Sequence, residues 1–386
     1  MLPHHQVDGP PGAPLVVLGN SLGTTGDMWA PQMPSLLQRF RVVRYEHRGH
    51  GGTTAPPGPF SIADLGGDLV ELLDHLGEQR ASLCGLSLGG MVAMWVAAHH
   101  PARVDRLVLA CTAAHLPPAS AWDERAAVVR GSAVVPGAGM VRDAGTGVVL
   151  DTVIARYFTA GFLSRRPDAR ASVAVMLAAA EPEGYAGCCE AIGAMDLRPD
   201  LERIAAPTLV IAGALDPVVT PPMAVDLAQA ITGAGLLVIP SAAHLANIEQ
   251  PEAFTTAAVD HLAGTAGERG RRTRRAVLGD AHVERSAAAA TPFTEPFVDL
   301  ITRYAWGEIW TRPGLDGATR SCITLAMLVA LGRFDELDLH VRGAVRNGLS
   351  HDQIGEVLLQ TAVYCGVPAA NTAFAVARRA LEEPEG

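Results

Sequence analysis

A serine in a tight turn is the first residue of this chain whose setting suggests chemistry. Residues 85–89 read Gly-Leu-Ser-Leu-Gly, after the apolar run 81–84 and before a helical pattern. G-x-S-x-G between a strand and a helix is typical of a nucleophile elbow, a strained turn that holds the serine oxygen above a sheet edge. Glycine on either side relieves the crowding of that turn. We therefore predict that Ser87 attacks a carbonyl carbon.

A serine hydroxyl is a good nucleophile only when a base removes its proton and a carboxylate orients that base. Asp216 follows the apolar run 208–213, and His244 follows the run 236–240. In a parallel sheet both would lie at carboxyl ends of strands, in the order Ser, Asp, His that an elbow predicts. Of thirteen histidines, only His244 has this placement after the acid. The predicted triad is Ser87, Asp216 and His244.

Acyl transfer also needs N–H donors for the negative charge that develops on the substrate oxygen. One is predicted to be the backbone N–H of Leu88, the residue after the nucleophile. The other is expected in the loop 19–23, which reads Gly-Asn-Ser-Leu-Gly. We assign it by position to the N–H of Leu22. Ser21 lacks an elbow and is expected to shape the loop.

The elements that must position these residues form an α/β pattern from residue 14 to about 262. Apolar runs alternate with helical patterns, which indicates a mostly parallel, doubly wound sheet covered on both faces. The predicted strands are 14–18, 41–45, 81–84, 104–110, 207–212 and 236–239. A helix is predicted over 61–77, with a capping box of Ser61 and Asp64. Strand signals stop at about 115–198, which predicts a helical cap over the active edge, with Trp122 as a wall of the substrate site.

The pattern changes after residue 263. Residues 264–275 are rich in Gly and Arg and lack apolar periodicity, so we predict a linker between a first domain, 1–263, and a second, 276–386. The second domain shows helical runs and few strand signals, which predicts an all-α helical domain.

Glu336 and His340 form a second pair that could do chemistry. They are four positions apart, so they share one face of a predicted helix. A carboxylate beside an imidazole raises its pKa and holds its orientation, which suits proton delivery. An ordinary pair on a helix surface would have the same spacing, and spacing alone leaves both interpretations open.

Composition excludes several classes of function. The net charge of −10 argues against nucleic acid or an anionic membrane as a partner. The sequence contains no lysine, which excludes Schiff-base chemistry, covalent attachment of pyridoxal phosphate and a P-loop. Six scattered cysteines without C-x-x-C or zinc-type spacing indicate reduced thiols and no metal site. With no secretion signal at the start and no long apolar run, we expect a cytoplasmic protein.

The first domain resembles the α/β-hydrolase family over residues 3–262. The matching segments are 19–24, 48–51, the elbow 85–89 and 244–251. The Asn-Ser-Leu-Gly form of the loop is similar to that of one branch, the 3-oxoadipate enol-lactonases. The resemblance implies an α/β-hydrolase fold and hydrolysis of a small lactone carboxylate.

The second domain resembles the 4-carboxymuconolactone decarboxylase family over residues 272–386. The matching segments are 303–310, 319–324, 336–340 and 364–371. The superfamily includes alkylhydroperoxidase-like proteins with C-x-x-C just before the histidine, and the absence of cysteine there disfavours thiol peroxidase activity.

This second resemblance implies decarboxylation without a cofactor, with His340 as the acid and Glu336 as its support. Arg320 and Arg333 are candidates to bind the substrate carboxylates, although each could equally form a structural ion pair. The family also implies a homo-oligomer through the helical domain.

Together the two resemblances predict a bifunctional enzyme of the β-ketoadipate pathway, because the decarboxylase product would be the lactonase substrate. Whether Ser87 forms an acyl-enzyme or His244 activates water directly stays open. One alternative is a general carboxylesterase fused to a helical oligomerisation module without chemistry. Another is a scaffold that retains the elbow for packing.

Overall fold

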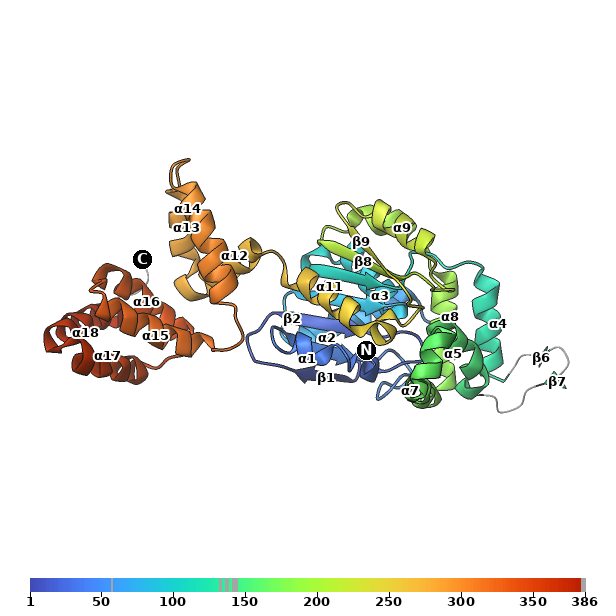
Figure 1. Cartoon of the computed structure of the whole chain (residues 1–386). Helices are drawn as coiled ribbons and strands as arrows, with labels where there is room; N and C mark the ends of the chain where they lie inside the picture. Colours follow the sequence, from blue (N-terminus) through green and yellow to red (C-terminus); the bar gives the residue numbers. More distant parts are fainter. Residues whose placement is uncertain (57, 132–133, 136–138, 141–144, 383–386) are drawn as a thin grey trace. The chain divides into compact units, whose positions relative to one another are not determined.

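The chain forms two compact units, Met1–Leu262 and Ala263–Gly386, each with its own secondary structure (Figure 1). The structure is a computed structural model that describes residues 1–56, 58–131, 134–135, 139–140 and 145–382. Among these residues, no helix is long and apolar enough to span a membrane.

The first unit is built on a seven-stranded sheet with the strand order β1-β3-β2-β4-β5-β8-β9. Its strands are β1 (His5–Asp8), β2 (Leu15–Gly19), β3 (Arg41–Tyr45), β4 (Ala81–Leu86), β5 (Val104–Ala110), β8 (Thr208–Gly213) and β9 (Gly235–Ile239). β1 pairs antiparallel with β3, and every other pair in the sheet is parallel. Every residue of β2 and β4 is buried, as expected for parallel strands covered on both faces.

The six predicted strands are confirmed, with ends that differ by one or two residues. The edge strand β1 escaped prediction because its four residues, His-Gln-Val-Asp, contain no apolar run and none of them is buried. The predicted helix is confirmed as α2 (Ile62–His75). Its capping box is also confirmed, because the Asp64 N–H donates to Ser61 Oγ at 3.2 Å and the Ser61 N–H donates to Asp64 Oδ2 at 2.7 Å.

Further helices cover the sheet. They are α1 (Met33–Leu36), α3 (Leu88–His99), α9 (Pro221–Ala230), α10 (Ala246–Glu249) and α11 (Pro251–Ala263). α3 packs against β2, β4 and β5, and α9 packs against β8 and β9. The strand β4 and the helix α3 therefore meet at residues 86–88, which places the predicted elbow at the carboxyl edge of the sheet.

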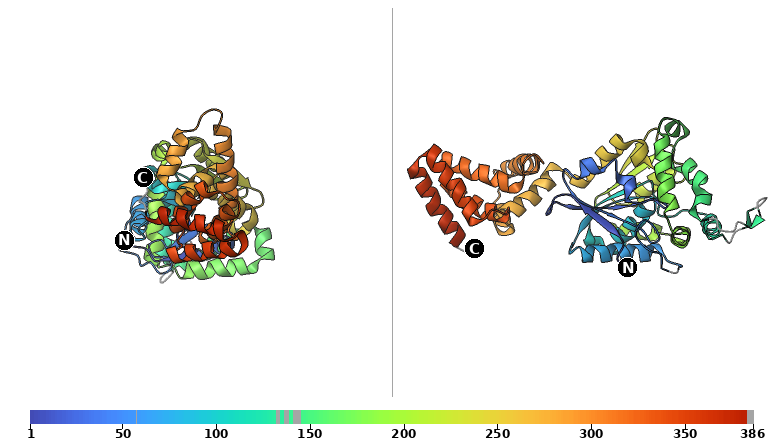
Figure 2. Two further views of the ribbon diagram at one scale, coloured as in Figure 1. Left: turned by 90° about the vertical axis from the view of Figure 1, so that its left-hand side faces the viewer. Right: turned by 90° about the horizontal axis from the view of Figure 1, so that it is seen from below.

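A group of helices between β5 and β8 forms the cap of the first unit (Figures 1 and 2). It contains α4 (Ala119–Val129), α5 (Leu150–Tyr157), α6 (Ala160–Arg165), α7 (Pro167–Ala178) and α8 (Pro182–Ala194). A two-stranded hairpin of β6 (Val134–Val135) and β7 (Gly139–Met140) was not predicted. Residues 132–133, 136–138 and 141–144 of the predicted cap lie outside the described residues. The cap is tied to the catalytic edge, because the Leu245 N–H donates to the Tyr157 carbonyl at 3.0 Å.

In its described residues, the second unit contains helices and connecting loops but no strand. Its helices are α12 (Ala266–Leu278), α13 (Asp280–Ala288), α14 (Glu295–Ile301), the π-helix η5 (Thr302–Ile309), α15 (Gly317–Ala330), α16 (Phe334–Arg346), α17 (His351–Cys365) and α18 (Val367–Glu382). The larger hydrophobic cluster joins α15 to α18 around Leu325, Leu337 and Leu358. A smaller cluster joins α12, α13 and η5 around Val277, Val283 and Trp306.

The predicted linker at 264–275 is wrong, because most of it forms the helix α12. A capping box begins this helix: the Glu268 N–H donates to Thr265 Oγ1 at 3.2 Å and the Thr265 N–H donates to Glu268 Oε2 at 2.7 Å. Gly270 of this helix allows close packing rather than flexibility. A Cβ on Gly270 would lie 1.9 Å from the Thr302 carbonyl oxygen, so only glycine lets α12 lie this close to η5.

Candidate active sites

The elbow serine has the strained backbone that the sequence predicts. Ser87 has φ +54° and ψ −115°, and it is 6% exposed. Its backbone N–H donates to the Ala110 carbonyl at 2.9 Å, and its carbonyl accepts from Thr112 Oγ1 at 2.8 Å. A Cβ on Gly85 would lie 2.2 Å from the Gly89 carbonyl oxygen, so the turn requires glycine there. Bonds to the neighbouring strand thus hold the strained serine in place.

The predicted acid and base meet as a buried pair. His244 Nδ1 lies 2.8 Å from Asp216 Oδ2, and the two residues are 2% and 3% exposed. The other oxygen, Asp216 Oδ1, accepts the N–H groups of Val218 at 2.8 Å and Val219 at 3.1 Å. A carboxylate on Nδ1 holds the imidazole in the tautomer that leaves Nε2 as the base. Among the described residues, no hydrogen bond joins Ser87 Oγ to His244.

The loop after β2 presents the N–H of Leu22. The neighbouring N–H groups are engaged: Ser21 donates to Met28 Sδ at 3.3 Å, and Gly23 donates to His50 Nε2 at 2.9 Å. Leu88 is the first residue of α3, so its own N–H has no intrahelical acceptor. Among the described residues, neither the Leu22 N–H nor the Leu88 N–H, the two donors predicted for the oxyanion, forms a hydrogen bond.

Asn20 holds this loop in place through both polar atoms of its side-chain amide. Asn20 Nδ2 donates to the Tyr45 carbonyl at 2.8 Å and to Glu46 Oε2 at 3.0 Å, while Oδ1 accepts from Trp29 Nε1 at 3.0 Å. The Asn20 carbonyl accepts the N–H of Gly89 at 2.9 Å. The loop and the elbow are thus joined by direct hydrogen bonds.

Two buried histidines support the same loop as neutral imidazoles. Burial is the main cause that lowers the pKa of His47 to about 3 and the pKa of His50 to about 4. His50 accepts the Gly23 N–H through Nε2, and its Nδ1 lies 3.0 Å from the Arg48 carbonyl. The neutral form of His50 therefore holds the residue next to Leu22.

Glu336 and His340, the predicted decarboxylase pair, lie on α16, which packs against the smaller hydrophobic cluster. The His340 ring is parallel to that of Trp306 in η5, at an interplanar angle of 6° and a centroid distance of 6.4 Å. A π-helix segment such as η5 often marks a functional site. Burial lowers the pKa of His340 below its ordinary 6.5, His282 of α13 lowers it further, and Glu336 opposes them.

The expected rise in the pKa of His340 is therefore wrong. Glu336 acts in the predicted direction, but it is exposed and its effect is smaller than that of burial. The described residues show no hydrogen bond between the two side chains. Burial therefore favours the neutral imidazole of His340 in the free protein.

The substrate-binding candidates occupy different surroundings. Trp122 lies in α4 and donates from Nε1 to the Leu116 carbonyl at 3.0 Å. Arg320 lies in α15, where one terminal nitrogen donates to the Arg312 carbonyl at 2.8 Å while Nε is buried without a partner. Arg333 is exposed and precedes α16. In the part of the chain that the structure describes, neither arginine forms an ion pair, and the geometry brings neither into contact with His340.

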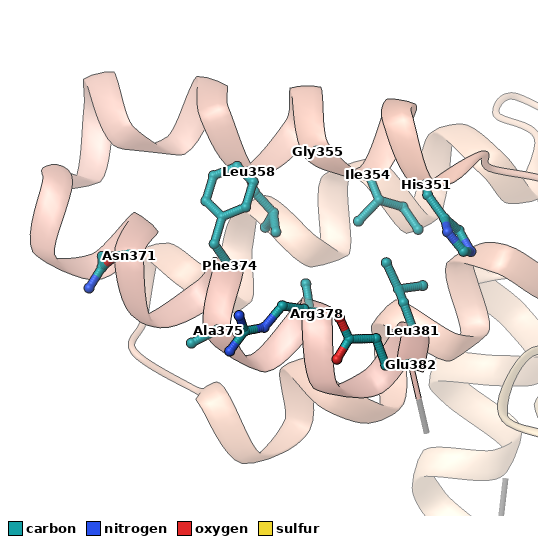
Figure 3. A pocket seen from close by; sticks show the side chains of 11 residues that line it. His351, Ile354, Gly355, Leu358, Asn371, Phe374, Ala375, Arg378, Leu381 and Glu382 are labelled. Carbon is teal, nitrogen blue, oxygen red and sulfur yellow. The ribbon is translucent and has the colours of Figure 1, made fainter. Parts of the chain in front are cut away.

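A surface groove of about 700 Å³ lies between α17 and α18, lined by His351, Leu358, Phe374 and Arg378 among others (Figure 3). Neither Glu336 nor His340 lines this groove. Glu336 and His340 instead lie on α16, where His340 faces Trp306 of η5 and feels the charge of His282 of α13.

Comparisons with known proteins find relatives of both units. The profile described as alpha/beta hydrolase fold matches residues 14–251, and that of the carboxymuconolactone decarboxylase family matches residues 295–379. A 3-oxoadipate enol-lactonase of Acinetobacter baylyi is 40% identical over 244 residues, which are 63% of this chain and 86% of the relative. A 4-carboxymuconolactone decarboxylase of the same organism is 42% identical over 116 residues, 30% of this chain and 87% of the relative. The chain is a fusion of an α/β hydrolase and a member of the carboxymuconolactone decarboxylase family.

The fold of the α/β hydrolase unit agrees with a solved relative. The crystal structure of the enol-lactonase from Burkholderia xenovorans LB400 matches with a TM-score of 0.63 and 41% identity, over 68% of this chain and 96% of that one. The fusion thus joins a hydrolase to a decarboxylase, each matched over most of the length of its relatives.

Some residues around the hydrolase site were not predicted. Tyr157 ends α5, and its hydroxyl donates to the Leu22 carbonyl while its ring stacks on His244 at a centroid distance of 5.5 Å. Glu249 connects the histidine loop to the cap, because it accepts the Ala243 N–H at 2.9 Å and the Thr159 N–H at 3.2 Å. The sequence carries no signal for the Tyr157 contacts, since they join residues more than eighty positions apart.

The decarboxylase site also has neighbours that were missed. His282 acts on His340, and Arg274 in turn acts on His282. Arg274 is 8% exposed, and its Nε is buried without a partner. Arg274 lies within the segment predicted as a linker and His282 follows it, so neither was predicted to lie near His340.

Proposed function

We propose that the chain catalyses two consecutive steps of the protocatechuate branch of the β-ketoadipate pathway. The second unit decarboxylates 4-carboxymuconolactone to 3-oxoadipate enol-lactone, and the first hydrolyses that lactone to 3-oxoadipate. The observation that carries the proposal is the buried Asp216–His244 pair beside the Ser87 elbow, in a chain that also carries the decarboxylase unit. The product of the one reaction is then the substrate of the other.

In the hydrolase unit, Ser87 is the nucleophile. Nε2 of His244 takes the proton of the Ser87 hydroxyl as Oγ attacks the lactone carbonyl carbon, and Asp216 stabilises the imidazolium. The N–H groups of Leu22 and Leu88 bind the oxyanion. Collapse of the tetrahedral intermediate breaks the ring C–O bond, and His244 returns the proton to the enol oxygen. The enol tautomerises to the ketone.

Water then hydrolyses the acyl-enzyme, with His244 again as the base and Ser87 as the leaving group. The products are the free carboxylate and the regenerated hydroxyl. Direct attack by water activated by His244 would give the same product without the covalent step. Trapping of an acyl group on Ser87 by rapid quench and mass spectrometry distinguishes the two routes.

In the decarboxylase unit, the substrate itself is the electron sink. Loss of CO2 from the ring carbon sends its electron pair through the ring alkene to the lactone carbonyl and forms a dienolate. Protonation of the carbon α to that carbonyl completes the reaction, and we assign this proton to His340. A bound carboxylate beside the imidazole would raise the pKa of His340 and counter the effect of burial. Glu336 adds to that rise.

The substrate carboxylates need cationic partners. Arg320 and Arg333 stay our candidates from the sequence, and neither forms an ion pair within the described residues. Two other cationic side chains do act on the predicted acid, one directly and one through the other. His282 lowers the pKa of His340, and Arg274 lowers the pKa of His282. A substrate anion would favour the protonated forms of both imidazoles.

The expected partners are small lactone carboxylates and further copies of the chain, and we expect neither nucleic acid nor membrane. A homo-oligomer through the second unit is supported by exposed large apolar side chains there. They include Leu331 (72%), Leu359 (56%), Val363 (77%), Tyr364 (80%) and Val367 (71%). Light scattering of the purified protein should give a multiple of the single-chain mass. All six cysteines are free thiols, which supports the cytoplasm as the compartment.

The activities are tested with purified full-length protein and each lactone in turn. We expect the enol-lactone to be hydrolysed well above its spontaneous rate, and 4-carboxymuconolactone to lose CO2. A general carboxylesterase with an inert module would hydrolyse simple esters as well as the enol-lactone and would leave 4-carboxymuconolactone unchanged. A scaffold would accelerate neither reaction.

A further inference from the structure

The cap carries a half-buried cation that the proposed mechanism does not use. Arg125 lies in α4, with its guanidinium over the rings of Trp122 and Tyr185, at 5.7 Å and 5.3 Å from the centroids. One terminal nitrogen donates to the Tyr185 hydroxyl. Its Nε is buried and has no hydrogen-bond partner within the described residues.

No carboxylate of the described residues pairs with Arg125. Arg130, at the end of the same helix, shows the contrast, because Glu183 and Glu190 of α8 both bind its guanidinium. The groups that act on Arg125 are Tyr185, Cys189 and Tyr157, all of which are neutral at pH 7. A buried guanidinium N–H without an acceptor costs free energy unless a ligand supplies the acceptor.

A second cation adds to the local positive charge. Arg156 lies next to Tyr157 in α5, and its pKa is lowered first by burial and then by Arg125. Two cations that lie close enough to interact produce a field that attracts an anion. Within the described residues, the region around Arg125 therefore has positive charge, an Nε–H without an acceptor and no anionic partner.

This region adjoins the oxyanion loop. The Tyr185 ring packs against Gly23, where a Cβ would lie 3.0 Å from Tyr185 Cε2, and stacks on His50 at a centroid distance of 6.3 Å. Tyr157, which also feels the charge of Arg125, donates to the Leu22 carbonyl and stacks on His244. One layer of aromatic side chains thus separates the guanidinium from the catalytic residues.

We propose that Arg125 is the specificity-determining residue of the hydrolase unit and binds the carboxylate of the lactone substrate. This inference rests on the proposed function, since the enol-lactone carries a carboxymethyl group on the ring carbon next to the scissile oxygen. Nε and Nη2 form the side fork that binds a carboxylate, with one N–H of Nη2 kept for the Tyr185 hydroxyl, and Trp122 and Tyr185 hold the guanidinium in place. The cap therefore selects lactones that carry an acid, while the sheet edge does the chemistry.

The test compares two substrates with the same ring. One is the enol-lactone, and the other bears a methyl group in place of the carboxymethyl group. Arg125→Met should lower kcat/KM for the carboxylated ring by roughly 10- to 100-fold, the effect of one charge-assisted pair, and leave the neutral ring nearly unchanged. Arg125→Lys should retain part of the preference. Arg130→Met, which removes a cation already paired with Glu183 and Glu190, should not change the ratio.

Equal losses for both rings would show a purely structural role and overturn the inference, and so would no loss for either. A wild-type protein that fails to hydrolyse the enol-lactone overturns the proposed function instead. In that case, or if Arg125→Met does not fold, inhibition of neutral-lactone hydrolysis by a small anion tests whether the cap of the wild-type protein binds a carboxylate. Butyrate should inhibit the wild-type protein at least tenfold better than butyramide. Equal inhibition by the two compounds would contradict an anion site.

Discussion

The ring of Tyr157 stacks on the imidazole of His244, with centroids 5.5 Å apart and planes inclined by 27°. The same side chain donates its hydroxyl to the Leu22 carbonyl. A residue of the cap therefore contacts both the catalytic base and the loop that presents the oxyanion donor. Because the Leu245 N–H also donates to the Tyr157 carbonyl, this position links the cap to the histidine loop through backbone as well as side chain.

Tyr157→Phe tests this link, because it keeps the stacked ring and removes only the hydroxyl. Without the hydroxyl, the Leu22 carbonyl loses its hydrogen-bond donor. The Leu22 N–H, which we assign to the oxyanion, is then held less firmly. We expect kcat of lactone hydrolysis to fall roughly tenfold, with little change in KM. Tyr157→Ala, which also removes the ring, should cost more. Steady-state kinetics of both variants check the order, and an unchanged kcat in Tyr157→Phe would show that the hydroxyl does not position Leu22.

The two buried histidines predict a loss of stability in acid. Their pKa values are about 3 for His47 and about 4 for His50, against 6.5 in an unfolded chain. The unfolded state therefore binds protons first, so stability is intact above pH 6.5 and declines as the pH falls toward 4. Retention of ester hydrolysis after incubation in urea measures this. His50→Gln should flatten the decline, and a transition independent of pH between 6.5 and 4.5 would contradict the neutral assignment.

The close approach of α12 to η5 predicts opposite effects at two glycines of one helix. Gly270→Ala places a methyl group against the Thr302 carbonyl, 1.9 Å away, and should destabilise the second unit by about 1–3 kcal/mol. Gly267→Ala is the matched control, since its nearest atom is 3.5 Å away. Its higher helix propensity should leave stability unchanged or raise it by up to about 1 kcal/mol. The fraction of decarboxylase activity that survives heating measures the stability of both variants. Equal fractions for Gly270→Ala and Gly267→Ala would contradict the close packing at Gly270.

Much of the hydrolase site could be predicted because a parallel sheet leaves strong local signals. Its buried strands are continuous apolar runs, so residues such as Asp216 and His244 are marked by where those runs end. The contacts of Tyr157 and Arg125 left no such signal, because a cap helix shows only an amphipathic stripe and not what it covers. The error at 264–275 has a physical origin. Glycine is read as flexibility, whereas Gly270 serves close packing between helices.

The second unit gives a prediction on pH. If protonated His340 is the acid, decarboxylation should decline as the pH rises through its pKa in the substrate complex. Glu336 raises that pKa, so Glu336→Gln should move the decline to lower pH. Asp335→Asn is the control, because Asp335 is exposed on the same turn and has no resolved effect on His340. Profiles of kcat against pH that coincide for wild type and Glu336→Gln would exclude Glu336 from this role.

The central claim is that one chain makes a lactone and then opens it, and Ser87→Ala tests this most directly. The purified variant is supplied with 4-carboxymuconolactone while CO2 and both products are followed over time. We predict that CO2 is released at the wild-type rate and that the enol-lactone accumulates, disappearing only as fast as it does without enzyme. Formation of 3-oxoadipate by Ser87→Ala at the wild-type rate would contradict the account.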